Sequence, residues 1–212
     1  GLFQFGFGIN VIPGLCDEYS MSEDGRDYIF HIRDDLKYAN GKRLHIDDVK
    51  AGILKGLNGP NHNLLEMISG AKEYLQFKDE NLLWVRVLDH NRIKIRLEYP
   101  YLAFLSNFAT NIADPYLDGD LPVGMGPFKI VSWQRSKELV LEANDFYYEG
   151  RPTIDILMFI VTMDEDLGYE LFKSGELSMY QPGQRLLRKV KKEIPELLTT
   201  TPELSVQFLC FH

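Results

Sequence analysis

Histidines are the side chains best suited to acid–base or metal chemistry near neutral pH, and this sequence scatters them along its length. No HExxH pattern and no His/carboxylate pair at metal-ligand spacing occurs. His31 shares the polar face of a predicted strand with Arg33, while His90 lies in a predicted turn and His45 near a predicted helix start. These positions favour structural roles. The full set is His31, His45, His62, His90 and His212.

Motifs for nucleophilic or nucleotide chemistry are also missing from the sequence. It contains no GxSxG elbow, P-loop or kinase-like set. The fragments Gly6-Phe7-Gly8 and Gly124-Met125-Gly126 lack the third glycine and the strand-to-helix context of a dinucleotide site. The acidic clusters are predicted to be exposed at turns or helix starts, whereas a general acid needs a desolvated carboxyl group. The sequence therefore predicts no enzyme. The clusters are Asp34-Asp35, Asp47-Asp48 and Asp164 to Asp166.

Composition narrows the class of protein further. The 212 residues include 31 acidic and 23 basic ones, a formal net charge of -8 that argues against nucleic acid as a partner. No apolar run approaches the roughly 20 residues of a membrane helix. The dense basic run from Arg185 to Lys192 is interpreted as the solvated face of a helix. The chain opens within a predicted strand, at Gly1 to Phe5, so the lack of a signal peptide leaves open that a leader was removed.

The two cysteines, Cys16 and Cys210, have neither CxxC nor Cys/His spacing. Each lies in an apolar stretch, which predicts two small buried thiols. A disulfide between them is left open, and so is the compartment. The sequence gives no reason to expect a metal site or a cofactor.

Strands and helices alternate in a mixed order. Apolar and polar residues alternate from Tyr28 to Arg33, which predicts a half-buried strand. Asp47 and Asp48 suit the positive end of a helix that Gly59-Pro60 ends. Asp89-His90-Asn91 joins two strands as a hairpin turn. The predicted strands are 28–33, 83–88, 93–97, 128–134, 139–143, 156–161, 178–180 and 205–211, and the predicted helices are 47–57, 63–74, 101–108, 165–173 and 185–192.

The predicted last strand, Ser205 to Phe211, is apolar and has no strand after it. Such a strand would be an exposed edge, which complete proteins avoid. The chain is therefore interpreted as a piece of a longer protein. Through Val206 to Phe211 the isolated piece is expected to be able to pair with a second copy of itself.

Several segments in order resemble one family. Tyr28 to Tyr38, YIFHIRDDLKY, is similar to the family string YTFHLRDDVKF, and Pro122 to Phe128 is similar to PVGTGPY. Pro13 to Tyr19 resembles PGLAESW, and Leu139 to Asn144 resembles VLEAN. Phe146 to Pro152 looks like DYWGGRP. The family is the family 5 extracellular solute-binding proteins of ABC importers, the oligopeptide-, dipeptide- and nickel-binding group.

This resemblance covers almost the whole chain, with a few departures. Met125 takes the small polar position of the glycine loop, and His45 takes the place of the usual threonine. Tyr19 and Tyr147-Tyr148 stand where tryptophan is usual. None of these threatens the fold, but Met125 is expected to change what the pocket accepts.

The resemblance implies an α/β fold of mixed sheets with flanking helices, part of a two-lobed periplasmic-binding-protein-like (class II) fold. Residues 1–120 would form a smaller subdomain of lobe 1 with helices and a hairpin. Residues 121–212 would form the main sheet of lobe 1 and end at the hinge, with the second lobe absent. Such proteins close on a solute like a clamshell and deliver it to a membrane permease.

By this resemblance the chain would bind peptides or small polar solutes outside the cytoplasmic membrane, anchored to it in the full-length protein. Asparagine amides and close backbone approach at glycine would line the cleft, although the asparagines are equally interpretable as caps. A metal or metallophore receptor of the same family stays an alternative if His31 and His62 converge. A regulatory or scaffold module is the other. The candidate ligand-binding residues are Asn61, His62, Asn63, Asn107, Asn111, Gly124, Met125 and Gly126.

Overall fold

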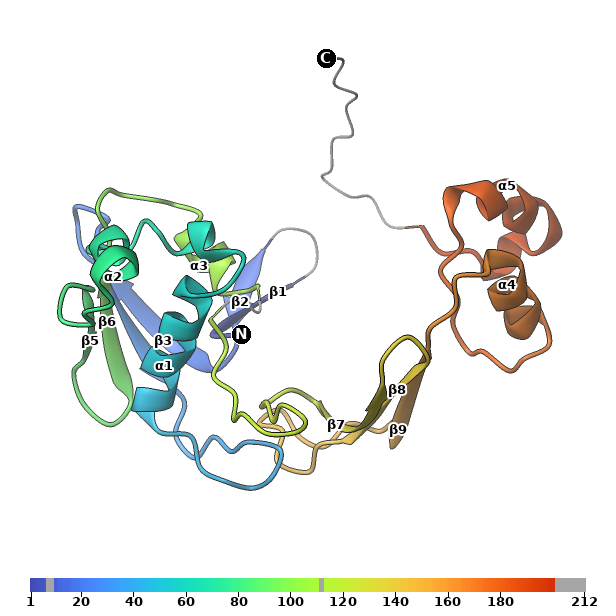
Figure 1. Ribbon diagram of the computed structural model, residues 1–212, viewed down its shortest axis with the longest axis horizontal. Helices are drawn as coiled ribbons and strands as arrows, with labels where there is room; N and C mark the ends of the chain where they lie inside the picture. The colour runs from blue at the N-terminus through green and yellow to red at the C-terminus, as the bar shows by residue number, and fades with distance from the viewer. Residues whose placement is uncertain (7–9, 111–112, 201–212) are drawn as a thin grey trace, which may run out of the picture. The chain divides into compact units, whose positions relative to one another are not determined.

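A computed structural model describes residues 1–6, 10–110 and 113–200 of the chain (Figure 1). It divides into two compact units, Gly1–Phe159 and Ile160–His212, which are described separately. The subdomain boundary expected near residue 120 stays a prediction. The expected strand at 205–211 lies outside the described residues, and so does the pairing through Val206 to Phe211.

The first unit is built on an antiparallel sheet in the order β3-β4-β6-β5. In β4, Tyr28, Phe30 and Ile32 are buried and the residues between them are partly exposed, as the alternation predicted. The hairpin of β5 and β6 is also confirmed, with Val85 opposite Ile95. The bounds are β3 Cys16–Met21, β4 Asp27–Ile32, β5 Val85–Val87 and β6 Arg92–Arg96.

Helix α1 (Ile46–Leu57) packs on this sheet. The carboxylate of Asp48 accepts a hydrogen bond from the backbone N–H of His45 (3.0 Å), which satisfies an otherwise unpaired donor at the helix start. Val49, Ile53 and Leu57 turn one stripe of the helix into the core. The sequence predicted this helix correctly.

The single helix predicted at 63–74 is wrong. The structure has a 3₁₀ turn η1 (His62–Leu64) and a separate helix α2 (Ala71–Phe77). Gly70 between them has a φ of 77°, which an α-helix cannot contain, and Ile68 forms a β-bridge with Leu97. Tertiary pairing therefore overrides helix propensity here.

The helix predicted at 101–108 is shorter in the structure. Helix α3 comprises Phe104–Asn107. The N–H of Phe104 bonds the carbonyl of Tyr101 (3.1 Å), so the residues after Pro100 form a turn before the helix begins.

A small hairpin and a second sheet complete the first unit. Strand β1 (Phe3–Phe5) confirms the strand predicted at the start of the chain, but its partner β2 (Val11–Pro13) and strand β3 were not predicted. The second sheet has the order β7-β8-β9, and its predicted hairpin is confirmed. Its bounds are β7 Phe128–Gln134, β8 Glu138–Ala143 and β9 Ile156–Ile160.

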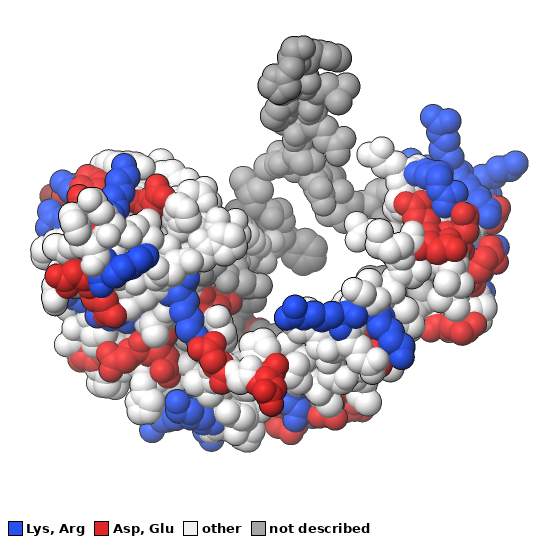
Figure 2. All heavy atoms as spheres, in the orientation of Figure 1, with Lys and Arg blue, Asp and Glu red and all other residues white. Residues whose placement is uncertain are grey.

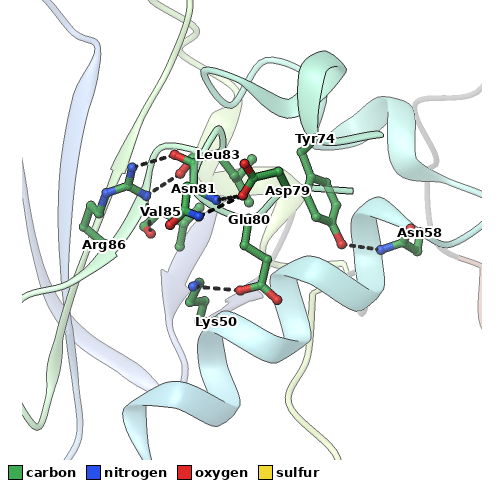
Figure 3. A network of polar contacts seen from close by, with 9 residues as sticks. All are labelled: Lys50, Asn58, Tyr74, Asp79, Glu80, Asn81, Leu83, Val85 and Arg86. Carbon is green, nitrogen blue, oxygen red and sulfur yellow. Dashed lines mark hydrogen bonds and ion pairs between the residues drawn. The ribbon is translucent and has the colours of Figure 1, made fainter. Parts of the chain in front are cut away.

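Polar contacts join the segment between α2 and β5 to helix α1 on one side and to Arg86 of β5 on the other (Figure 3). Lys50 of α1 pairs with Glu80 at 2.9 Å, and Arg86 donates to the backbone carbonyls of Asn81 and Leu83. The segment that packs against Gly70 is therefore held in place from two sides.

The second unit has its own small core. Helices α4 (Glu165–Lys173) and α5 (Gln184–Glu193) were both predicted, and they bury Tyr169, Leu186 and Val190 together. A short 3₁₀ turn η2 (Pro195–Leu197) follows. None of the described helices is long and apolar enough to cross a membrane.

The strand predicted at 178–180 is wrong, since these residues form no strand in the structure. Met179 is 86% exposed. The ring of Tyr180 packs near that of Tyr169, and its hydroxyl donates to the carbonyl of Glu165 at 2.9 Å. Helix packing, not sheet pairing, thus fixes this segment.

Candidate functional site

A hollow in the first unit surrounds the glycine loop before β7. It has a volume of about 510 Å³ and opens to solvent. Residues far apart in the sequence form its wall, because the segment after α3 lies against the loop. The polar and loop residues of the wall are Asp114, Tyr116, Gly124, Met125, Gly126 and Lys129.

Hydrogen bonds from other parts of the chain hold the glycine loop. The N–H of Ala39 donates to the carbonyl of Gly124 at 2.9 Å. The side-chain amide of Asn144 donates to the carbonyl of Gly126 at 2.8 Å. Met125 between them is buried among core residues. The loop therefore presents a fixed backbone to the cavity.

Asn144, at the end of the VLEAN-like segment, is fully buried. Besides its bond to Gly126, its Oδ1 accepts from the N–H of Phe146 (2.9 Å) and its own N–H donates to the carbonyl of Pro127 (2.8 Å). A buried amide with both ends bonded acts as a fixed brace. The sequence did not identify this positioning role.

Replacing Asn144 with alanine is expected to loosen the loop and to cost about 1–3 kcal/mol of stability, because the Gly126 carbonyl loses its donor. Hydrogen exchange across residues 124–128 should accelerate. The matched control is Asn81→Ala, which removes an amide hydrogen-bonded to Asp79 at an exposed turn. Equal exchange in the Asn144→Ala variant and the unmodified chain would contradict the brace.

The cavity offers groups of both charges. Asp114 contributes a partly exposed carboxylate that pairs with the amino group of Gly1 at 3.1 Å, and Lys129 contributes an amine that pairs with Glu142 at 3.3 Å. Tyr116 contributes a phenol whose ring centroid lies 3.9 Å from the amine of Lys55. Opposite charges on one wall suit a ligand that carries both an ammonium and a carboxylate.

A second cavity of about 280 Å³ adjoins the first, and Leu15 and Met125 contribute to both. The side chain of Gln4 donates to the hydroxyl of Tyr148 at 2.6 Å on its wall. Burial raises the pKa values of Tyr147 and Tyr148, so both phenols stay protonated donors. Met125 therefore lies between two neighbouring cavities.

The residues predicted from the sequence are spread over several places. Gly124, Met125 and Gly126 line the first cavity together. Asn61 lines a separate hollow of about 270 Å³ that shares Asp114 and Tyr116 with the first.

The other predicted residues lie elsewhere. His62 bonds Glu66 at 2.7 Å, and Asn63 is exposed. Asn107 is buried and donates to the carbonyl of Leu64 at 2.7 Å, which fastens α3 to η1. Asn111 lies outside the described residues.

His31 bonds two side chains of the outer sheet surface. Its Nδ1 lies 2.6 Å from Asp17, and its Nε2 lies 2.8 Å from the amide of Asn91. The hydrogen bond with Asp17 raises the pKa of His31. Desolvation raises the pKa of Asp17, but the bond and the charge of His31 outweigh it and lower the value. His31 and His62 thus each have a carboxylate of their own, and the described residues contain no group of three potential metal ligands.

Cys16 is a buried free thiol, as predicted. Its Sγ donates to the carbonyl of Glu18 at 3.0 Å, and burial raises its pKa to about 12. A thiol that stays protonated is a poor nucleophile. Cys210 lies outside the described residues.

The sequence missed Asp114, Tyr116 and Lys129 as cavity residues. Asp114 and Tyr116 belong to the segment from Asn111 to Gly126, whose content of Asp, Pro and Gly predicts a loop. Loops held by a rigid scaffold often carry binding groups. The position of Asp114 and Tyr116 in such a loop is the sequence feature that could have indicated them.

The sheets and flanking helices match part of the fold of a two-lobed periplasmic binding protein. A sequence model described as "Bacterial extracellular solute-binding proteins, family 5 Middle" matches residues 10–212. The chain belongs to this family, as the ordered segments predicted.

Relatives agree with that assignment. The chain is 29% identical to the dipeptide-binding protein of Escherichia coli (strain K12), over 100% of this chain and 44% of the relative. It is 28% identical to di/tripeptide-binding protein 4 of Pseudomonas aeruginosa (strain UCBPP-PA14), over 93% and 43%. These are binding proteins and not enzymes, in agreement with the sequence-based prediction.

A crystal structure of a periplasmic oligopeptide-binding protein from Borrelia burgdorferi superimposes with a TM-score of 0.80 at 25% identity. The match covers 90% of this chain and 43% of that one. The chain thus spans less than half the length of these relatives.

Proposed function

We propose that the chain is part of the substrate-binding component of an ABC importer and captures dipeptides or oligopeptides. The observation that carries the proposal is the cavity at the glycine loop, in a chain whose family and relatives are solute-binding. A peptide has an ammonium, a carboxylate and a row of amides. Asp114, Lys129 and the backbone of Gly124 to Gly126 supply the complementary groups.

The mechanism follows from the shape of the site. The cavity is open on one side, so it covers only part of a ligand. We propose that a second lobe, for which the greater length of the relatives leaves room, closes over the rest. The energy of closure comes from contacts that only the closed state makes. The loaded protein then docks on a membrane permease, outside the cytoplasmic membrane and anchored to it.

Native mass spectrometry on the full-length protein, purified without denaturation, tests this function. We expect a retained mixture of short peptides. The variant Asp114→Ala should retain much less of the bound peptide, because the substitution removes the carboxylate of the cavity wall. Asp118→Ala is the matched control, since Asp118 pairs with Lys55 outside the cavity wall.

Two results would contradict peptide capture. A discrete metal or metallophore mass would support the metal receptor. An empty protein that short peptides do not stabilise against heat would support a regulatory or scaffold role.

A further inference from the structure

Helix α5 of the second unit has one apolar and one basic side. Leu186 and Val190 are buried against Tyr169. The opposite side carries five cations within eight residues, in a chain with net charge -8. Figure 2 shows lysine and arginine side chains projecting from this region. The cations are Arg185, Arg188, Lys189, Lys191 and Lys192.

Two of these cations are engaged within the unit. Arg185 pairs with Glu165 at 3.3 Å and with Asp166 at 2.9 Å. The amine of Lys189 lies 5.1 Å from the ring centroid of Tyr169. They help to hold α5 on α4 and are not free for a partner.

The other three, Arg188, Lys191 and Lys192, are exposed. Within residues 1–6, 10–110 and 113–200, no carboxylate forms an ion pair with any of them. Their spacing of three and four residues puts them on one face of the helix, where like charges repel. We call these three residues the α5 basic face.

Several cations on the strands of the first unit, in contrast, form ion pairs with carboxylates. Arg92 pairs with Asp89 at 2.7 Å, and Lys94 with Asp27 at 3.1 Å. Lys129 pairs with Glu142 in the same way. The α5 basic face thus consists of three exposed cations that form no ion pair within the described residues.

We propose that the α5 basic face docks on an anionic phospholipid surface. Lipid headgroups diffuse laterally, so their phosphates can gather under three neighbouring cations without a preformed matching partner. Juxtamembrane Lys and Arg are attracted to such surfaces, and the arginine fork suits phosphate. The apolar side of α5 is already packed on Tyr169, so the contact is peripheral and electrostatic and involves no insertion.

Docking on the membrane is a separate activity from solute capture, and it does not depend on which solute the protein binds. It would keep a receptor close to the membrane that contains its permease, and it would leave the cavity of the first unit untouched.

Vesicle co-sedimentation of this chain tests the proposal. The vesicles contain equal parts phosphatidylglycerol and phosphatidylcholine, or phosphatidylcholine alone. We expect binding to the anionic vesicles only, and release in about 1 M salt, where the Debye length falls to about 3 Å. The variant Arg188→Glu/Lys191→Glu/Lys192→Glu should bind at least about tenfold more weakly.

The matched control is Lys42→Glu/Lys72→Glu/Lys137→Glu. It makes the same change of net charge at three exposed lysines of the first unit, and it should bind like the unmodified chain. Circular dichroism verifies that both variants fold.

Several results would overturn the proposal. They are equal binding to both vesicle types, no binding to either, or an equal loss in the two triple variants. Retention on immobilised polyglutamate without vesicle binding would instead assign the face to an acidic protein.

Discussion

Replacing Gly70 with alanine is expected to destabilise the first unit by at least about 3 kcal/mol. Two costs add at this position. The φ of 77° lies in the left-handed region that residues with a Cβ avoid. An added Cβ would also lie 1.8 Å from the backbone carbonyl oxygen of Leu82. The segment 78–86 cannot move away cheaply, because Lys50 and Arg86 hold it (Figure 3).

Urea unfolding followed by tryptophan fluorescence measures this loss. Both tryptophans, Trp84 and Trp133, belong to the first unit, so the signal excludes the second unit. The control Gly150→Ala has a φ of 95° but no atom within 4 Å of the added Cβ. It should cost only about 1–2 kcal/mol. A similar loss in both variants would show that the contact with Leu82 adds nothing.

Replacing Phe30 with alanine is expected to cost about 3–5 kcal/mol, the range for a large aromatic side chain in a packed core. Phe30 is fully buried in the middle of β4. Its ring lies 5.6–5.7 Å from the rings of Phe3 and Phe108, centroid to centroid, in edge-on contacts. The cavity left behind would therefore separate β1 and α3 from the central sheet.

The same fluorescence titration measures the effect. Phe77→Ala is the matched control, because Phe77 is 64% exposed at the end of α2. Its loss should stay within about 0.5 kcal/mol, as for ordinary surface changes. If Phe30→Ala cost no more than Phe77→Ala, the aromatic cluster would not be the centre of the core.

Together these predictions identify the parts of the fold that keep the binding site rigid. The core around Phe30 and the turn at Gly70 hold the sheet and its helices. Ala39 and Asn144 then transmit that rigidity to the glycine loop through two hydrogen bonds. A binding wall that is held before the ligand arrives loses less entropy on binding.

Local patterns were enough to predict much of the fold. Alternation predicted β4, turn residues predicted the hairpin β5–β6, and the apolar spacing predicted α1 and α5, while the hairpin β7–β8 and α4 were also predicted. Each of these signals lies within one element and its flanks, where side chains meet the same neighbours in any fold. The ordered resemblance was sufficient for the family.

The sequence failed where a long-range contact decides the outcome. Helix propensity at 63–74 lost to the bridge between Ile68 and Leu97 and to the left-handed Gly70. Met179 and Tyr180 were predicted to belong to a strand, but no described strand pairs with them. Tyr180 instead donates a hydrogen bond to Glu165 at the start of α4.

The residues of the candidate site also fall into those that were found before the structure and those that only the structure revealed. The family resemblance singled out the glycine loop, where the two glycines around Met125 permit close backbone approach. Only the tertiary structure put Asp114 and Lys129 on the same wall and turned Asn107 into the core. An asparagine has the same hydrogen-bonding groups in a core as in a cleft. Which one it serves depends on the chain segments that pack around it, and residue types and local spacing do not determine those.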